Sequence, residues 1–363
     1  MTLSIEFIYG LVLLIISSFL VSLVITPVSI WLAKKLDIIN YPGKSAHHIQ
    51  KQPTPQAGGL AILFSLVIII LVFRLWANTD ILKILLPALV ILSFGLWDDR
   101  FGMNAPLKLF GQVCAVTLLV FSGIRVQFFE NPQFFINISE PLGLIIDLFI
   151  TYFWIIAITN AFNLIDSMDG LALGTSLITI LFFLISAFQS GQEVLLYLSL
   201  TLLGINLGIY LFNRYPAKTF LGDSGAQTLG FILSVIAIFL SPKALSQSST
   251  WFVPIIVFGV PIFDTTLVTI SRMRKGLPFY KAQLDHTYHR LVGFGWTNPQ
   301  AVNTMHLMAI LNGVLAFACI NFSPLISNIL FGLWLSIFFY LLFYLEKNFP
   351  NPSPPSTSVR KQN

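Results

Sequence analysis

Residues 7–33 read FIYGLVLLIISSFLVSLVITPVSIWLA, an apolar run without a charged side chain. A helix needs about 20 mostly apolar residues to cross the hydrocarbon core of a bilayer. The run is too long for the core of a signal peptide, and it carries no small-residue cleavage site. We therefore expect a first transmembrane helix here.

Similar apolar runs follow along the chain. Of its 363 residues, 56% are hydrophobic and only 10% are charged, whereas soluble domains carry about 25% charged residues. The mean hydropathy is +0.84. This composition excludes a disordered chain, a nucleic-acid-binding domain and a cytosolic globular enzyme. We expect an all-α polytopic membrane protein with about 11 transmembrane helices, over residues 7–33, 58–77, 81–97, 106–124, 142–159, 170–188, 194–213, 224–241, 251–271, 301–321 and 324–346.

The distribution of Lys and Arg predicts the side of each loop. One alternate set of loops holds 16 of the 20 basic residues, and the other set holds Arg74, Lys83, Arg125 and Lys243. Because cytoplasmic loops are enriched in Lys and Arg, we expect the N-terminus outside and the C-terminus in the cytoplasm. The same rule explains the net charge of +5 without a polyanion-binding surface.

The chain is expected to form one integral-membrane domain, residues 1–347, and a disordered cytoplasmic tail, residues 348–363, that is rich in Pro and Ser. Cys114 and Cys319 lie inside apolar runs and form no disulfide or metal pattern. The polar motifs described next all fall on the predicted cytoplasmic side, which indicates a catalytic or binding site opening to the cytoplasm.

Asp98 and Asp99 are adjacent carboxylates where an apolar helix is expected to end. Such carboxylates repel each other and are costly to desolvate unless a cation offsets them. They indicate a metal-assisted site or a base beside one, and the alternative is a helix end with solvated acids. Lys108 follows after a short turn and could bind a phosphate.

A second motif places Asn160, Asn163, Asp166 and Asp169 three residues apart, which aligns them on one helical face or at a frayed helix end. Carboxylate and amide oxygens are hard ligands that suit Mg²⁺. The alternative is a polar helix terminus capped by Asn and Asp. Asp223, which opens another apolar helix, is either an N-cap, a metal ligand or both.

Basic loops supply the remaining motifs. His286, His289 and Arg290 lie in the longest expected cytoplasmic loop, where basic neighbours favour an anion such as a diphosphate. Zinc is less favoured because no cysteine lies near. Lys44 and His47 add positive charge in an earlier loop, for which the alternative is a loop that only sets topology.

Together these motifs resemble those of the polyprenyl-phosphate N-acetylhexosamine-1-phosphate transferases. The likeness covers residues 37–302, and its specificity comes from several motifs in the same order. The shared features are Asp98-Asp99, the Asn163, Asp166 and Asp169 run, Gly222-Asp223-Ser224-Gly225, the loop of His286, His289 and Arg290, Pro53-Thr54-Pro55 with Gly58-Gly59, and Pro261-Ile262-Phe263-Asp264.

The resemblance implies a Mg²⁺-dependent phosphotransferase, with Mn²⁺ as a substitute. Such an enzyme moves a sugar 1-phosphate, here N-acetylglucosamine 1-phosphate, from a UDP-sugar to undecaprenyl phosphate and releases UMP. This would be the first membrane step of cell-wall or surface-polysaccharide synthesis, O-antigen included. A homodimer would also fit the family. We expect a bacterial inner membrane protein with its active site facing the cytoplasm, and membrane lipid but no nucleic acid as a partner.

Motif positions imply the residue roles. Asn163 and Asp223 would hold the metal, and Asp98, Asp99 and Asp223 would be the catalytic carboxylates. Substrate-binding residues would be Lys44, His47 and Lys108 near the acceptor phosphate, Asp166 and Asp169 near the nucleotide, and His286, His289 and Arg290 near the diphosphate or sugar.

The chain departs from the family pattern at Tyr288, where a His is common, and at Lys44, where an Arg is common. Without this histidine, altered sugar contacts or a weaker activity are expected. The late loop lacks a longer His-rich stretch, which favours the simple-hexosamine branch over the muramoyl-pentapeptide branch. Two rivals remain. One is a transporter or flippase of a lipid-linked or anionic solute, which would use Asp147 and Asp264 inside apolar runs, and the other is an inactive family member.

Overall fold

The structure of the chain is a computed structural model. The described residues are 5–41, 52–129, 138, 141–239, 251–278 and 283–348. Lys44 and His47 lie outside this part, and so does the expected tail, apart from Asn348 at the end of the last helix.

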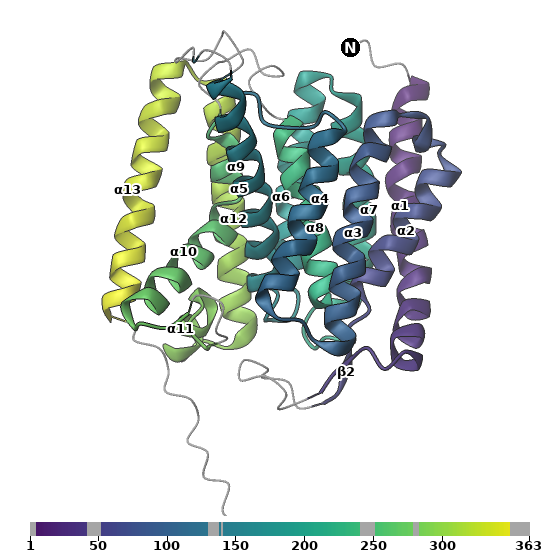
Figure 1. The fold of residues 1–363 in the computed structure, drawn as a ribbon, viewed down its shortest axis with the longest axis horizontal. Coiled ribbons are helices and arrows are strands. Elements are labelled where there is room, and N and C mark those ends of the chain that lie inside the picture. Colours follow the sequence, from purple (N-terminus) through teal and green to yellow (C-terminus); the bar gives the residue numbers. More distant parts are fainter. Residues whose placement is uncertain are drawn as a thin grey trace, which may run out of the picture.

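Helices make up almost all of the described fold (Figure 1). They are α1 (Ile5–Lys35), α2 (Gly58–Val72), the 3-10 helix η1 (Leu75–Ala77), α3 (Thr79–Phe101), α4 (Ala105–Phe121), α5 (Leu142–Ile165), α6 (Leu171–Ser190), α7 (Glu193–Asn213), α8 (Gly222–Phe239), α9 (Val253–Val257), α10 (Gly259–Arg274), α11 (Thr287–Gly293), α12 (Asn298–Asn321) and α13 (Pro324–Asn348). Two short strands, β1 (Ile39–Asn40) and β2 (Thr54–Pro55), pair antiparallel.

The predicted all-α polytopic membrane architecture is confirmed. Within the described residues, 8 helices are long and apolar enough to cross a membrane: α1, α3, α5, α6, α7, α8, α12 and α13. Two further predicted spans correspond to the shorter apolar helices α2 and α4. The run at 251–271 is divided at Phe258 into α9 and α10, so the total of about 11 spans stays a prediction.

Small residues bring α1 and α7 close together. Ser18 and Ser22 of α1 are fully buried and face Gly204 and Gly208 of α7. A Cβ atom on Gly204 would lie 2.5 Å from the Cβ of Ser18, so only glycine permits this approach. Such small-residue contacts are a common way for helices to pack in a membrane.

Helix α8 lies inside the bundle, packed on α3 and α5. Of its 18 residues, 89% are buried. A Cβ atom on Gly95 of α3 would overlap the backbone of Ser224, and one on Gly230 of α8 would lie 3.0 Å from the Cα of Thr159 in α5. These close approaches place the ends of α3 and α5 beside the start of α8.

The strand pair β1–β2 and helix α11 lie at the lower end of the bundle in Figure 1, opposite the start of α1. The backbone of Phe220, just before α8, donates to the carbonyl of Pro55 in β2 over 3.0 Å. This hydrogen bond joins the strand pair to the loop between α7 and α8, which borders the candidate site.

Candidate active site

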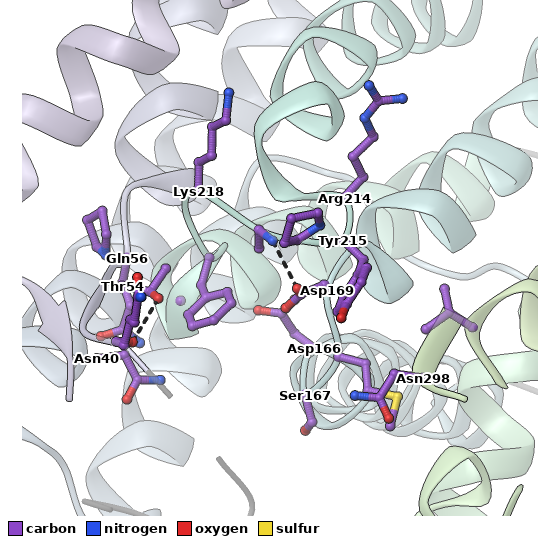
Figure 2. Close-up of a pocket in the computed structure, with 18 of the residues that line it drawn as sticks. Asn40, Thr54, Gln56, Asp166, Ser167, Asp169, Arg214, Tyr215, Lys218 and Asn298 are labelled. Carbon is purple, nitrogen blue, oxygen red and sulfur yellow. Dashed lines mark hydrogen bonds between the residues drawn. The ribbon is translucent and has the colours of Figure 1, made fainter. Parts of the chain in front are cut away.

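A cavity of about 1020 Å³ opens at the lower end of the bundle (Figure 2). Its walls come from the end of α1, the strand pair, the turn between α5 and α6, the loop between α7 and α8, and the start of α12. Predicted site residues that line it are Asn163, Asp166, Asp169 and Asp223. Sequence motifs separated along the chain therefore meet at one cavity.

Asp166 and Asp169 follow the end of α5. The Asp169 carboxylate accepts a 2.9 Å hydrogen bond from the backbone N–H of Ala217, which joins the α5–α6 turn to the loop before α8 (Figure 2). Burial, followed by the nearby carboxylates with Asp223 first among them, raises the pKa of Asp166 well above its ordinary value. Ionising Asp166 therefore costs free energy unless a cation lies nearby.

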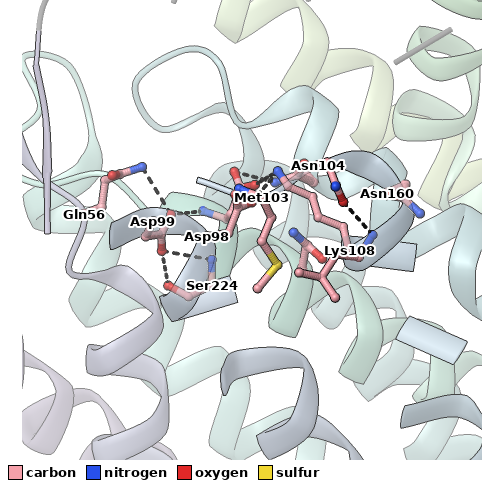
Figure 3. Close-up of polar contacts among 12 residues, drawn as sticks. Gln56, Asp98, Asp99, Met103, Asn104, Lys108, Asn160 and Ser224 are labelled. Atoms are coloured by element: carbon pink, nitrogen blue, oxygen red, sulfur yellow. Dashed lines mark hydrogen bonds and ion pairs between the residues drawn. The ribbon is translucent and has the colours of Figure 1, made fainter. Parts of the chain in front are cut away.

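Lys108 bridges the carboxylates of Asp98 and Asp223, which lie on separate helices. Asn163 donates its side-chain N–H to the other oxygen of Asp223 over 3.1 Å. Asp98 also accepts the backbone N–H of Met103 over 2.6 Å, which holds the turn between α3 and α4 (Figure 3). One lysine thus joins the ends of α3, α4 and α8.

Asp99 caps α8 from a neighbouring helix. Its carboxylate accepts the backbone N–H groups of Asp223 at 2.7 Å and Ser224 at 3.1 Å, and the Ser224 hydroxyl at 2.5 Å (Figure 3). Gln56 donates to the same carboxylate at 3.3 Å. Asp99 therefore supplies the capping contacts that the sequence suggested for Asp223. The Asp223 side chain is left to face Lys108 and Asn163.

Gly222 makes this cap possible. Its φ of +70° lies in the left-handed region, which favours glycine. A Cβ atom there would also lie 2.7 Å from an Asp99 oxygen. Any larger residue would strain the backbone and displace the capping carboxylate.

The predicted histidine loop lies apart from the cavity lining. His286 Nδ1 is 2.7 Å from Asp264, and Asp264 also accepts the backbone N–H of Thr287 at 2.6 Å. Arg290 is buried and donates to Glu346 and to the Leu345 carbonyl, both at 2.9 Å. These contacts hold α11 against α10 and α13.

Tyr288 belongs to α11, and its hydroxyl lies 3.5 Å from the Leu164 carbonyl near the end of α5. Its ring stacks on His286 at 5.2 Å and lies 4.5 Å from the His289 ring. Burial raises the pKa of Tyr288 well above its ordinary value, so the hydroxyl stays protonated. The residue that departs from the family pattern thus occupies a fully buried packing position.

Cavity residues that the sequence analysis did not select include Asn40, Arg214, Lys218, Asn298 and Asn303. Arg214 and Lys218 were among the predicted cytoplasmic bases, which was their only signal. The asparagines had none, because Asn40 and Asn298 fall in expected loops and Asn303 lies near the start of the expected span at 301–321. Glu346 was also missed, since its partner Arg290 lies 56 residues earlier in the chain.

Within the described residues, no group of at least 3 His, Cys, Asp or Glu side chains is arranged to hold a metal by itself. Mg²⁺ commonly binds through one or two carboxylates together with waters and substrate phosphates. Asp223, Asp166 and the Asn163 amide supply hard oxygens at the cavity. The donor set therefore fits Mg²⁺ that shares its coordination with a phosphorylated substrate.

Comparison with known proteins shows which family the chain resembles. The model of glycosyl transferase family 4 matches residues 81–241, which contain the motifs from Asp98 to Asp223. The chain is 32% identical, over 93% of its length and 90% of the relative, to the probable undecaprenyl-phosphate N-acetylglucosaminyl 1-phosphate transferase of Bacillus subtilis.

Two other relatives are similar over most of the chain. The decaprenyl-phosphate N-acetylglucosaminephosphotransferase of Mycobacterium tuberculosis is 30% identical over 81% of this chain and 78% of its own. The phospho-N-acetylmuramoyl-pentapeptide-transferase of Oceanobacillus iheyensis is 29% identical over 84% of this chain and 96% of its own.

Proposed function

Because the chain belongs to the family of polyprenyl-phosphate N-acetylhexosamine-1-phosphate transferases, we propose that it transfers N-acetylglucosamine 1-phosphate from a UDP-sugar to undecaprenyl phosphate. An oxygen of the acceptor phosphate forms a new bond to the sugar-bound phosphorus of the donor. The bond between that phosphorus and the oxygen that bridges it to the UMP phosphorus breaks. UMP leaves. The reaction would begin the assembly of a cell-wall or surface polysaccharide.

One observation carries this proposal. The carboxylates Asp98 and Asp223, the amide of Asn163 and the Lys108 ammonium converge from four helices beside a large cavity. Phosphoryl transfer depends mainly on positioning and charge neutralisation, so carboxylates for a metal and a cation for a phosphate are the groups that it needs.

Mg²⁺ would be held by Asp223 and Asn163, with Mn²⁺ as a substitute. When bound, the ion would neutralise the charge on the donor diphosphate. Asp166 and Asp169, at the α5 end of the cavity, would position the nucleotide. Asp99 would act through the start of α8, because its contacts hold the backbone of Asp223 and Ser224.

Lys108 would hold the acceptor phosphate, and Asp98 would take its proton when that phosphate arrives protonated. His286 and His289 would contribute to the diphosphate or sugar end through the loop that they share. Lys44 and His47, which lie outside the described residues, would approach the acceptor phosphate.

Topology supports access from the cytoplasm. The predicted cytoplasmic loops hold 16 of the 20 Lys and Arg residues, and the cavity borders the ends of α1, α5 and α7, where those loops begin. We place the enzyme in the bacterial inner membrane, with its N-terminus outside and its C-terminus in the cytoplasm, as a homodimer.

No observation favours the transporter. Asp264 contacts His286 and the Thr287 backbone, and Asp147 accepts the backbone N–H groups of Phe128 and Phe129. Both acids thus hold local structure. The inactive-member hypothesis depends on Tyr288 alone.

The test is release of UMP by the purified chain in detergent, with undecaprenyl phosphate, Mg²⁺ and a panel of UDP-sugars. We expect release that requires the lipid, is lost with EDTA and is highest with UDP-N-acetylglucosamine. Asp223→Ala should abolish it, whereas Asp80→Ala, at the other end of α3, should not. If the folded wild-type protein released no UMP with any UDP-sugar of the panel, this result would contradict the proposed activity.

A further inference from the structure

Three amide side chains form a layer next to the carboxylates and lysine of the site. Gln112 of α4 donates to Asn160 of α5 at 3.2 Å and to Gln227 of α8 at 3.0 Å. Asn160 donates back to the Gln112 carbonyl oxygen at 2.8 Å and to the Ile156 backbone carbonyl at 2.8 Å. We call Gln112, Asn160 and Gln227 the amide layer.

Each residue of the amide layer lies on the same helix as a residue of the site, one turn further into the bundle. Gln112 follows Lys108 by four residues in α4, and Gln227 follows Asp223 by four residues in α8. Residues four apart lie on the same helical face. In α5, Asn160 precedes Asn163 by one turn.

Hydrogen bonds within the layer are directional. Both N–H groups of the Gln112 amide have acceptors, and its oxygen accepts from Asn160. Gln112 is 2% and Gln227 5% exposed, so the hydrogen bond between them is shielded from water. Asn160 is partly exposed. A buried amide that loses its partner inside a membrane protein leaves an unsatisfied polar group. Sliding or rotating one helix past another would break the hydrogen bonds within the layer.

Apolar packing alone would fix the relative positions of these helices less precisely. Leucine side chains tolerate small shifts, because their contacts have no required direction. The contacts between Lys108, Asn163 and Asp223 do have required directions, and Asn163 reaches Asp223 over 3.1 Å. A displacement of about 1 Å can lower the rate of an enzyme by about 100-fold.

We propose that Gln112, Asn160 and Gln227 are positioning residues, which set the register of α4, α5 and α8 and thereby place Lys108, Asn163 and Asp223 for phosphoryl transfer. This inference rests on the proposed function. None of the three lines the cavity, so they act through the residues one turn away and not on the substrate.

Steady-state kinetics of Gln112→Leu tests the inference, because this change removes the three hydrogen bonds within the layer. We expect kcat for UMP release to fall by about 10- to 100-fold. The KM for the UDP-sugar should stay within about twofold, since the cavity lining is unchanged. Gln227→Leu removes one hydrogen bond and leaves the Gln112–Asn160 pair, so its kcat should fall less.

Asn206→Leu is the matched control. Asn206 of α7 is also a fully buried amide and donates to Ser176 of α6 at 3.1 Å. We expect this variant to lower the thermal unfolding midpoint in detergent as much as Gln112→Leu does, with wild-type kcat at a temperature where both stay folded.

Wild-type kcat in folded Gln112→Leu would overturn the inference, and so would an equal fall of kcat in Asn206→Leu. If Gln112→Leu does not fold, Gln227→Leu decides, and its unchanged kcat would count against the layer. Failure of wild-type UMP release would instead overturn the proposed function, so the two failures are distinguishable.

Discussion

Two groups of charged residues lie at the same end of the bundle and differ in how their charges balance. The acid cluster, Asp98, Asp99, Asp166 and Asp223, forms salt bridges through Lys108 alone among the described residues. The paired cluster joins Asp264 to His286, Asp285 to Arg272 and Glu346 to Arg290.

Exposure separates the two groups only in part. Each side chain of the paired cluster is at most 8% exposed. In the acid cluster Asp98 is 7% exposed, whereas Lys108 is 29% and Asp223 30% exposed. A buried charge is tolerated when it has its own partner, and removing that partner is costly. The acid cluster has excess negative charge beside a cavity, which suits a metal and phosphates. Charge balance therefore separates the candidate site from the structural pairs.

Asp223→Asn should have the largest effect on activity. It removes a carboxylate charge with little change in shape, so metal binding and the Lys108 bridge are both lost. We expect kcat for UMP release to fall by about 10³-fold or more. Asp80→Asn, which changes an exposed acid at the far end of α3, should keep wild-type turnover. Near-normal turnover of Asp223→Asn would remove this residue from the proposed site.

Arg290→Glu tests the paired cluster. Because Arg290 and Glu346 are both buried, the substitution should lower the free energy of unfolding by about 3–5 kcal/mol. Thermal or denaturant unfolding in detergent measures this loss.

A charge swap gives the control. Arg290→Glu combined with Glu346→Arg should recover most of the stability and the wild-type KM for the UDP-sugar. Recovered stability without recovered KM would instead favour the sequence-based prediction that Arg290 binds the substrate.

Lys108→Met should reduce kcat by about 100-fold, because the acceptor phosphate loses its cation. The same change removes a positive charge next to Asp98 and Asp223. We therefore expect half-maximal activity at a lower Mg²⁺ concentration than in the wild type. Unchanged kcat and an unchanged Mg²⁺ requirement would show that Lys108 is a structural bridge only.

Asp166→Asn should have the smallest effect of these substitutions. Unlike Arg290→Glu, it should raise the stability of the folded protein. The pKa of Asp166 is raised by burial and by neighbouring carboxylates, so ionising it costs stability in the folded state. That cost is absent below the ordinary Asp pKa of about 3.9 and grows as the pH rises toward the raised pKa. With EDTA at neutral pH, we expect the unfolding midpoint to rise by about 2–4 °C.

Midpoints measured from acidic to neutral pH provide the check. The gain of Asp166→Asn should vanish at acidic pH, and Mg²⁺ should remove it at neutral pH by favouring the ionised wild type. An unfolding midpoint below that of the wild type at neutral pH would place Asp166 among the structural acids.

Much of the site was predictable because its residues belong to local motifs. Asn163, Asp166 and Asp169 were selected from their spacing and Asp223 from its place at a helix start, and all four line the cavity. The capping of α8 by Asp99 was not predictable. It depends on a contact across 124 residues, and the alternative considered for Asp223 did not involve a second helix.

The histidine loop shows the opposite case. Its residue types favoured an anion site, yet His286 and Arg290 contact Asp264 and Glu346. Residue type cannot tell a basic side chain that awaits a ligand from one already in contact with a distant acid. The break at Phe258 and the amide layer were missed for a related reason, since each depends on how neighbouring helices pack.

The sequence by itself determined the helical membrane architecture, the family and most of the cavity's acidic residues. Apolar runs and short motifs are local properties, and the cost of exposing polar backbone to lipid leaves few ways to arrange such runs. Only the tertiary structure decided which charges are balanced. Pairing depends on distances of a few ångströms between helices remote in sequence, so the carboxylates of the candidate site and the paired charges become distinguishable only when the bundle is assembled.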